Sequence, residues 1–220
     1  MLQASTLKFL KDLKKNNNKP WFEKHKDLYI GAKEDIEDLV EKVIAGLGKT
    51  DTEIANLQPK DCTYRIYRDV RFSKDKTPYK INMGAYLNKG GKKFPTAGYY
   101  MHFEPGRNMA GGGLWMPMAP ELNKVRQEID YSLAEWEKIL GNRAFKKSFS
   151  EGLEKEEILS RPPKGYSVDN PAIGYLKLKS FIVTRPFTDA EVQSKSFLRE
   201  LVRTFESMKD FVGFLNRAIE

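Results

Sequence analysis

A change in the spacing of apolar residues is the feature that most constrains how this chain can fold. Up to residue 47, apolar side chains recur every three or four positions, as on one face of a helix. From residue 63 they alternate with polar side chains, which is the period of a strand, and after residue 120 the helical spacing returns. No internal repeat or low-complexity linker divides the sequence. The pattern therefore predicts a single α+β domain over residues 1–220.

The same spacing, together with proline and glycine, sets the expected helices and strands. Pro20 suits the first turn of a helix, where its missing N–H loses no partner, and Gly48 suits a helix end. We expect an antiparallel meander of about five strands, with N- and C-terminal helices covering one face and a polar opposite face. The expected helices are at about 5–15, 20–47, 120–140 and 196–218, and the expected strands at about 63–72, 79–88, 97–104, 108–116 and 176–186.

Two groups of residues carry expectations about packing. Trp21 and Phe22 are large aromatics just after a helix start, so we expect them to be buried against the sheet. The glycines at 111–113 lack the spacing of a dinucleotide fingerprint. They allow close approach by a bulky ring, such as that of Trp21 or Trp115.

Composition excludes several classes of protein. Hydrophobic residues make up 40% of the chain and charged residues 31%, which favours a packed core over disorder. No apolar run approaches the ~18 residues of a membrane span. Cys62 is the single cysteine and His25 and His102 are the only histidines, so we expect no disulfide framework, no metal site and no cofactor. With no signal-peptide pattern at the start, the expected compartment is the cytoplasm.

Positive charge is concentrated in one stretch of the chain. Residues 60–93 contain ten lysines and arginines against three aspartates, which accounts for nearly all of the net charge of +8. A focused positive field attracts anions, whereas scattered lysines mainly aid solubility. The alternative is a solvated basic edge that discourages sheet aggregation.

Four segments together resemble a known family. They read NNNKPWF at 16–22, YRIYRDVRFSKDKTPYK at 64–80, GYYMHFEPG at 98–106 with GGGLWMP at 111–117, and LKLKSF at 176–181. This combination resembles the bacterial and fungal proteins of domain of unknown function 2461 over nearly the whole chain. The resemblance implies a full-length, single-domain protein and assigns no catalytic residue.

Polar residues of the expected sheet are the candidates for ligand binding. Side chains two apart on a strand share a face, so Arg65, Tyr67, Asp69 and Arg71 should line up. Arginine favours bidentate recognition of carboxylate or phosphate, and backbone N–H groups of the 73–78 turn can add to it. The alternative is cross-strand ion pairing on a half-exposed face. The predicted ligand-binding residues are Arg65, Tyr67, Arg71, Ser73, Lys74, Lys76, Lys80 and Tyr100.

The sequence leaves open whether the protein is an enzyme. Asp69, His102 and Glu104 are the candidate acid–base groups, provided that a reacting group lies within ~3 Å. Cys62 follows Asp61, which raises rather than lowers a thiol pKa, so a cysteine nucleophile is disfavoured. Arg68 falls on the apolar side of its strand, where either a bulge re-aims it or a carboxylate from a covering helix pairs with it.

These observations favour one function and leave an alternative. The first is binding of a small phosphorylated or carboxylated ligand on the Arg/Lys/Tyr-rich sheet face. The alternative is a nucleic-acid-binding accessory protein that uses the basic and aromatic side chains of residues 60–93. A third reading gives the charges a role in solubility alone. The sequence indicates no membrane partner and no particular oligomeric state.

Overall fold

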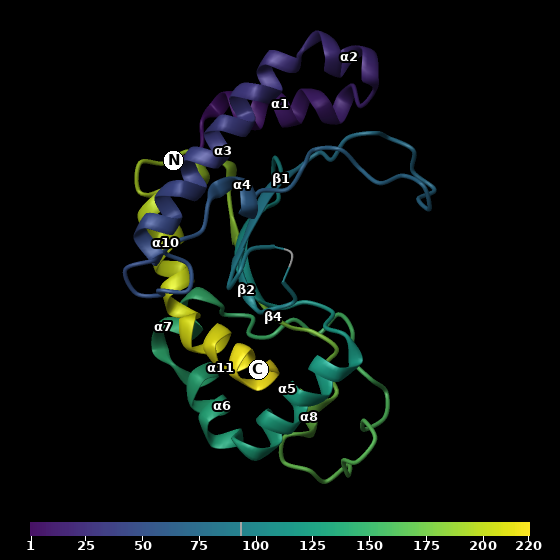
Figure 1. Cartoon of the computed structure of the whole chain (residues 1–220), viewed down its shortest axis with the longest axis vertical. Helices are drawn as coiled ribbons and strands as arrows, with labels where there is room; N and C mark the ends of the chain where they lie inside the picture. Colours follow the sequence, from purple (N-terminus) through teal and green to yellow (C-terminus); the bar gives the residue numbers. More distant parts are fainter. Residues whose placement is uncertain (93) are drawn as a thin grey trace.

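A four-stranded antiparallel sheet forms the centre of the molecule (Figure 1). The computed structural model describes residues 1–92 and 94–220, so that Lys93, the last residue of the basic stretch, lies outside the described residues. The strands are β1 (Met83–Asn88), β2 (Gly98–Phe103), β3 (Asn108–Leu114) and β4 (Phe181–Phe187), in the spatial order β1-β2-β3-β4. The α+β fold is confirmed, with one strand fewer among these residues than expected.

Helices flank the strands on both sides in the sequence. They are α1 (Ala4–Lys15), α2 (Lys19–Lys24), α3 (Lys26–Leu47), α4 (Pro59–Cys62), α5 (Ala119–Tyr131), α6 (Leu133–Gly141), α7 (Arg143–Ser148), α8 (Ile173–Leu176), α9 (Asp189–Val192), α10 (Phe197–Ser207) and α11 (Lys209–Ile219). Three long helices expected from the spacing are each broken once, at His25, Ser132 and Met208. Apolar spacing continues across a one-residue kink, so periodicity does not reveal the change of direction.

One face of the sheet is covered by α3, α10 and α11. In Figure 1, α3 and α10 lie on one side of the sheet, and the opposite side carries no such helical layer. The side chains that point toward the helices are fully buried, among them Ala85, Leu87, Tyr99, Met101 and Val183. The expected covering of one face by N- and C-terminal helices is therefore what the structure shows.

The glycines of β3 let the C-terminal helices approach the sheet. A Cβ atom on Gly112 would collide with the Met208 side chain and with the backbone oxygen of Gly98. Gly113 has a φ of +118°, and a Cβ atom there would meet the Phe211 ring at 2.8 Å. Backbone oxygens of Gly98 and Phe181 and the side chains of Met208 and Phe211 thus occupy the space that Cβ atoms would need, and no tryptophan does.

Residues 64–82, here called the arm, replace the strand expected at 63–72 and the first part of the one expected at 79–88. The arm is a hairpin that projects away from the sheet in Figure 1. Its two limbs are joined by backbone hydrogen bonds from Lys80 N to Ile66 O (2.7 Å) and from Arg68 N to Pro78 O (2.9 Å). An isolated bridge pairs Tyr67 with Tyr79. The alternating pattern is the same for a projecting two-stranded ribbon and for a sheet strand, which explains the wrong prediction.

Three consecutive asparagines hold the base of the arm and the chain reversal beside it. Asn16 Nδ2 donates to Asp12 O at the end of α1, and Asn18 Oδ1 accepts from Trp21 N as the N-cap of α2. Asn17 contacts the arm: its Nδ2 donates to Tyr79 O (2.9 Å) and its Oδ1 accepts from Tyr79 N (3.1 Å). Asn17 therefore pairs with the Tyr79 backbone as a neighbouring strand would.

Aromatic packing reinforces this attachment. The buried Phe22 ring stacks on the Tyr79 ring, with centroids 4.0 Å apart. Trp21 is only half-buried and stacks on His25, with centroids 4.2 Å apart. Phe22 is thus buried as expected, but against the arm, and Trp21 does not pack on the sheet as the sequence suggested.

The strand expected at 176–186 begins only at Phe181, because a buried arginine holds the preceding residues. Arg126 Nε donates to Leu176 O (2.7 Å), and its Nη2 donates to Leu178 O (3.1 Å). Leu176 ends α8, and Leu178 forms an isolated antiparallel bridge with Ile158 rather than a pair with β3.

Candidate functional site

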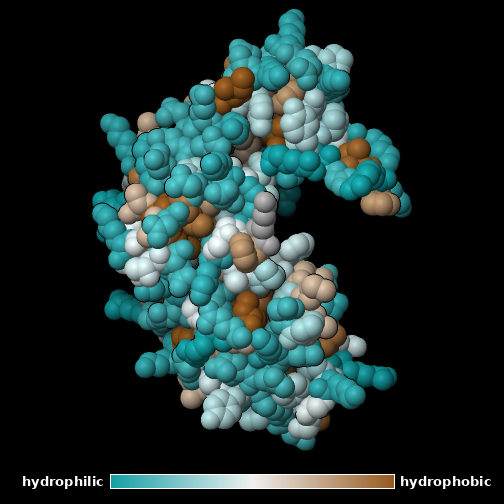
Figure 2. All heavy atoms as spheres, in the orientation of Figure 1, coloured by the Kyte–Doolittle hydropathy of each residue, from teal (hydrophilic) through white to brown (hydrophobic). Residues whose placement is uncertain are grey.

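The sheet face opposite the helices is lined by half-buried polar and aromatic side chains. Tyr86 and Tyr100 are directly paired across β1 and β2, and His102 pairs with Gly84 in the same two strands. Beyond them, Tyr100 pairs with Gly111, and Gly111 pairs with Thr184. Figures 1 and 2, drawn in one orientation, show that the molecule is hollowed between the arm and the part built by α5 to α8. We call this surface the open sheet face.

The base of the arm brings aromatic and basic side chains to the edge of the open sheet face. Tyr64 N donates to Gly84 O, and the Tyr64 ring lies edge-on to the Tyr100 ring, with centroids 6.5 Å apart. Lys80 Nζ lies 5.4 Å and Lys92 Nζ 6.0 Å from the Tyr64 ring centroid, within cation–π range. Together with Arg65, these side chains form what we call the arm-base cluster: Tyr64, Arg65, Lys80, Lys92 and Tyr100.

Ion pairs do not offset the positive charge of this cluster in the described residues, and the weaker Coulomb effect of Arg65 on Asp69 is the last of the causes that lower the pKa of Asp69. Within the described part of the chain, no carboxylate lies within ion-pair distance of Arg65 or Lys80. Burial, and then the positive charge of Arg65, lower the pKa of Lys80. Lys92 Nζ is held by the backbone oxygens of Lys60 and Thr63. Lys80 is half-buried and Arg65 is exposed, and cations without an ion-pair partner favour an anion from outside the protein.

A row of three polar side chains runs along β2 beside the cluster. The Tyr100 Oη and His102 Nδ1 atoms are 3.0 Å apart, and His102 Nε2 lies 3.5 Å from Glu104 Oε2. Burial raises the pKa of Tyr100 to about 12. Burial also lowers the pKa of His102, against a smaller opposite effect of Glu104. Two of the three candidate acid–base residues, His102 and Glu104, thus lie together.

Glu104, at the end of this row, is buried and surrounded by positive groups. Only 4% of the residue is exposed. Lys14 Nζ lies 3.5 Å from Glu104 Oε1, and Arg107 Nη1 lies 3.9 Å from Glu104 Oε2. The Glu104 carboxylate therefore contacts three basic side chains, those of Lys14, His102 and Arg107.

The tip of the arm holds the other predicted residues, away from the sheet. Asp69 and Arg71 form a bidentate pair, with Nε to Oδ1 at 3.0 Å and Nη2 to Oδ2 at 2.7 Å. This pair lowers the pKa of Asp69 and raises that of Arg71. Lys76 Nζ donates to Val70 O (2.9 Å), and Ser73 and Lys74 lie in the same turn. Asp69 and Arg71 therefore do not line up with Arg65 on the open sheet face.

Arg68 and Tyr67 have structural partners within or beside the arm. Arg68 Nη1 pairs with Asp75 Oδ2 at 2.5 Å and donates to Thr77 O at 3.1 Å. Its carboxylate partner is thus on the opposite limb of the arm, and no covering helix supplies it. The Tyr67 ring packs edge-on to the Phe22 ring, with centroids 6.0 Å apart, and so faces α2 rather than the open sheet face.

Of the eight predicted ligand-binding residues, the structure brings Arg65, Lys80 and Tyr100 together. Sequence reasoning missed the roles of Tyr64 and Lys92 in this cluster. By strand alternation Tyr64 lies on the face opposite Arg65, and Lys92 lies in the connection between the strands expected at 79–88 and 97–104. No local signal marks either residue, because both reach the cluster through the way in which the arm leaves β1.

The family model described as conserved hypothetical protein (DUF2461) matches residues 5–214. The chain belongs to this family. No curated protein and no solved structure matched it. The four segments that resemble the DUF2461 family meet in the fold, since Asn17 and Phe22 hold the arm while β2 and β3 carry the open sheet face.

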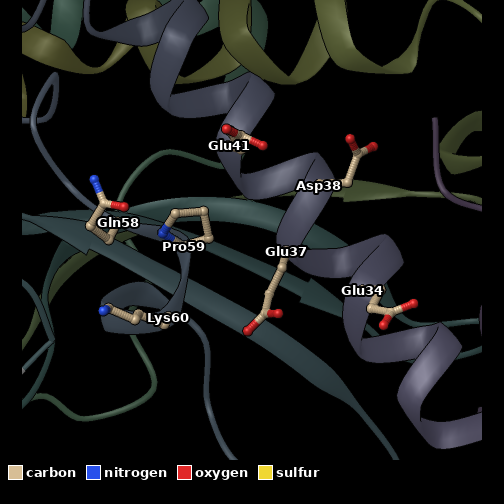
Figure 3. Close-up of a pocket in the computed structure, with 7 residues that line it drawn as sticks. All are labelled: Glu34, Glu37, Asp38, Glu41, Gln58, Pro59 and Lys60. Atoms are coloured by element: carbon tan, nitrogen blue, oxygen red, sulfur yellow. The ribbon is translucent and has the colours of Figure 1, made fainter.

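Two grooves elsewhere on this DUF2461 protein are poorer candidates for anion binding. One lies along α3 and is shown in Figure 3. Its lining is mostly acidic: Glu34, Glu37, Asp38, Glu41, Gln58, Pro59 and Lys60. The other, between α7 and α10, contains Arg185 and Arg203 together with Glu200, to which both are ion-paired. Local carboxylates already offset the positive charge in both grooves.

Two further findings concern metals and membranes. Across residues 1–92 and 94–220, no three His, Cys, Asp or Glu side chains are grouped closely enough to hold a metal ion. In the same residues no helix has the length and apolar character that crossing a bilayer requires.

Proposed function

We propose that the protein binds a small anionic ligand, phosphorylated or carboxylated, at the arm-base cluster, and that it does so in the cytoplasm. One observation supports this proposal: the positive charge of Arg65 lowers the pKa of Lys80, and neither cation has an ion-pair partner in the described residues. An arriving anion would offset the repulsion between the two cations and the desolvation of Lys80. Half-buried Tyr100 and His102 supply further hydrogen-bonding groups beside them.

Pairing elsewhere in the arm makes this cluster the favoured position. Arg68 is neutralised by Asp75, and Arg71 is neutralised by Asp69. Hydrogen bonds to a charged group contribute ~1.5–3 kcal/mol each, so that two of them supply roughly 3–6 kcal/mol. Because a millimolar dissociation constant corresponds to about 4 kcal/mol, we expect dissociation constants from about tens of micromolar to several millimolar.

A thermal-shift screen with small phosphates and carboxylates at fixed ionic strength tests the proposal. A ligand that binds only the folded state raises the melting temperature by mass action. We expect at least one anion to stabilise the wild type and to have little effect on Arg65→Ala/Lys80→Ala. Arg71→Ala is the matched control, because it removes one positive charge from the same arm but leaves the cluster intact. If no anion stabilises the wild type, or if the double variant responds equally, the proposal is wrong.

A second candidate function, nucleic-acid binding, is favoured by the tip of the arm. Phe72 is 96% exposed, and the basic residues Lys74 and Lys76 follow it in the turn. Exposed aromatics on basic segments can stack on bases, and apolar side chains can wedge between base steps. The tip thus offers an aromatic contact and positive charge on a projecting ribbon.

Fluorescence anisotropy with labelled single-stranded and double-stranded 20-mers separates the two functions. Nucleic-acid binding predicts a steep loss of affinity with salt and a weaker complex for Phe72→Ala and Lys74→Ala/Lys76→Ala. Binding of small anions alone predicts no such complex, with the arm-base variants as the sensitive ones.

A further inference from the structure

The contacts along the row formed by Tyr100, His102 and Glu104 arrange their hydrogen-bond donors in a single direction. Lys14 Nζ and Arg107 Nη1 lie within ion-pair distance of the Glu104 carboxylate, and a carboxylate only accepts hydrogen bonds. His102 Nε2, facing this carboxylate, then carries the proton of the neutral ring, and Nδ1 must accept from the Tyr100 hydroxyl. Protons can therefore move along the row from Tyr100 toward Glu104.

We propose that this row is a proton relay, and that the protein is an enzyme that removes a proton from a carbonyl-activated C–H bond of a small anion. The proposal rests on the proposed function for the position of the substrate, since the arm-base cluster shares Tyr100 with the row. Tyr100 is the outer group of the relay, His102 the proton acceptor, and Glu104 the positioning residue.

The proton step balances with the side chains present. The substrate C–H proton passes to Tyr100 Oη while the Tyr100 hydroxyl proton passes to His102 Nδ1. The electron pair of the broken C–H bond moves to the substrate carbonyl oxygen, forming an enolate. The imidazolium is stabilised by the Glu104 carboxylate, and the cations of the arm-base cluster, Lys80 and Arg65, would offset the negative charge that develops on the substrate. Return of the proton regenerates the row.

The surroundings of the row fit this chemistry. Burial lowers the pKa of His102, so that the ring is neutral and able to accept a proton at pH 7. Burial raises the pKa of Tyr100 to about 12, so that its hydroxyl proton is in place at the start. The charged and titratable groups that face His102 are Glu104, Arg107 and Tyr100.

Covalent catalysis by a nucleophile fits less well. Cys62 is fully buried, and its pKa is raised to about 11. Ser73 lies in the turn at the tip of the arm, where its hydroxyl accepts from Arg68 Nη2 at 3.4 Å. Proton transfer fits better, because His102 can accept a proton, Glu104 supplies a carboxylate, and Arg65 and Lys80 supply positive charge.

Two measurements test the relay. The first is histidine-selective ¹⁵N NMR, which is simple here because His25 and His102 are the only histidines. We expect His102 to be neutral at pH 7 with the proton on Nε2, and its Nδ1 signal to move in Tyr100→Phe. A proton on Nδ1, or a charged ring at pH 7, would overturn the relay whether or not any ligand binds.

The second measurement is solvent exchange into candidate substrates. The protein is incubated in D₂O with pyruvate, 2-oxoglutarate or dihydroxyacetone phosphate, and loss of the C–H signal is followed by ¹H NMR. We expect exchange above the protein-free rate for at least one probe. His102→Gln and Tyr100→Phe should slow it by roughly 10²–10⁴-fold, the usual contribution of a general acid–base group. Glu104→Gln should lower the rate and shift its pH profile, whereas Arg71→Ala should have no effect.

The outcomes distinguish the relay from the proposed function. If anions stabilise the wild type in the thermal-shift screen but no probe exchanges, the relay is wrong and ligand binding stands. If no anion binds and no probe exchanges, both proposals are wrong. Circular dichroism of His102→Gln and Tyr100→Phe shows whether a lost rate reflects a lost fold, and unchanged exchange in both folded variants overturns the relay.

Discussion

Asn17→Ala should release the arm from the body of the protein. The Asn17 side chain makes two hydrogen bonds to the Tyr79 backbone, which is 62 residues away in the sequence. Tyr79 is 3% exposed, so alanine leaves its N–H and C=O without these partners in a dry environment. A buried polar group that loses its partner costs ~1–3 kcal/mol.

This cost should fall on local opening of the arm. The amides of Lys80 and Arg68, which bond across the two limbs, report on that opening. A loss of ~1–3 kcal/mol corresponds to roughly 5- to 150-fold faster exchange of these amides. Hydrogen–deuterium exchange resolved by residue measures it directly, and urea unfolding measures the accompanying change in global stability.

Asn16→Ala is the matched control for this substitution. It removes a side-chain hydrogen bond to Asp12 O at the end of α1, but no contact with the arm. We expect faster exchange near the end of α1 and unchanged exchange at Lys80 and Arg68. If Asn17→Ala leaves those arm amides as protected as in the wild type, then Asn17 does not hold the arm and the reasoning is refuted.

Three further outcomes follow from burial and backbone geometry. The pKa of His102 is lowered in the folded protein, so as the pH falls the unfolded state takes up the histidine proton first. The free energy of unfolding should therefore fall as the pH drops through about 6.5. Urea titrations at pH 7.5 and 5.5 should show a smaller fall for His102→Gln than for the wild type. Cys62 is buried with a pKa raised to about 11, so its reaction with a thiol reagent at pH 8 should be slow in the native protein and fast in urea; equal rates would contradict its burial. Gly112→Ala would force a Cβ atom into the backbone of β2 and should destabilise the folded protein by ~1–3 kcal/mol or more. Gly213 lies on α11 with open space where a Cβ atom would be, so Gly213→Ala should stabilise the folded protein by ~0.5–1 kcal/mol. The melting temperatures of the two variants should therefore move in opposite directions.

Local patterns in the sequence were sufficient for much of the architecture. The switch of apolar spacing at residue 63 and its return after 120 predicted helices on both sides of an antiparallel sheet in one domain. These features follow from the period and the buried face of each element, which neighbouring residues encode. The concentration of positive charge between residues 60 and 93 is likewise a property of the sequence alone.

The partners of these residues were decided by tertiary structure. Alternation along 63–72 predicted a sheet strand, but the sheet ends at β1 and these residues form one limb of the arm, held by Asn17 and Phe22. Spacing gives the face on which a side chain lies, but it does not say which element packs there. A contact between Asn17 and Tyr79 therefore has no signal in local sequence.

The candidate site shows the same division. The sequence shows that arginines and lysines are concentrated in one stretch. It does not show which of them form ion pairs. Arg71 meets Asp69 at the tip, whereas Arg65 lies beside Lys80 at the base with no carboxylate partner among the described residues. The Coulomb energy of a charge depends on distances of a few ångströms to other charges. Those distances are set only when the arm folds against α2 and leaves β1. The sequence therefore determined the charges, and the tertiary structure decided which of them form ion pairs.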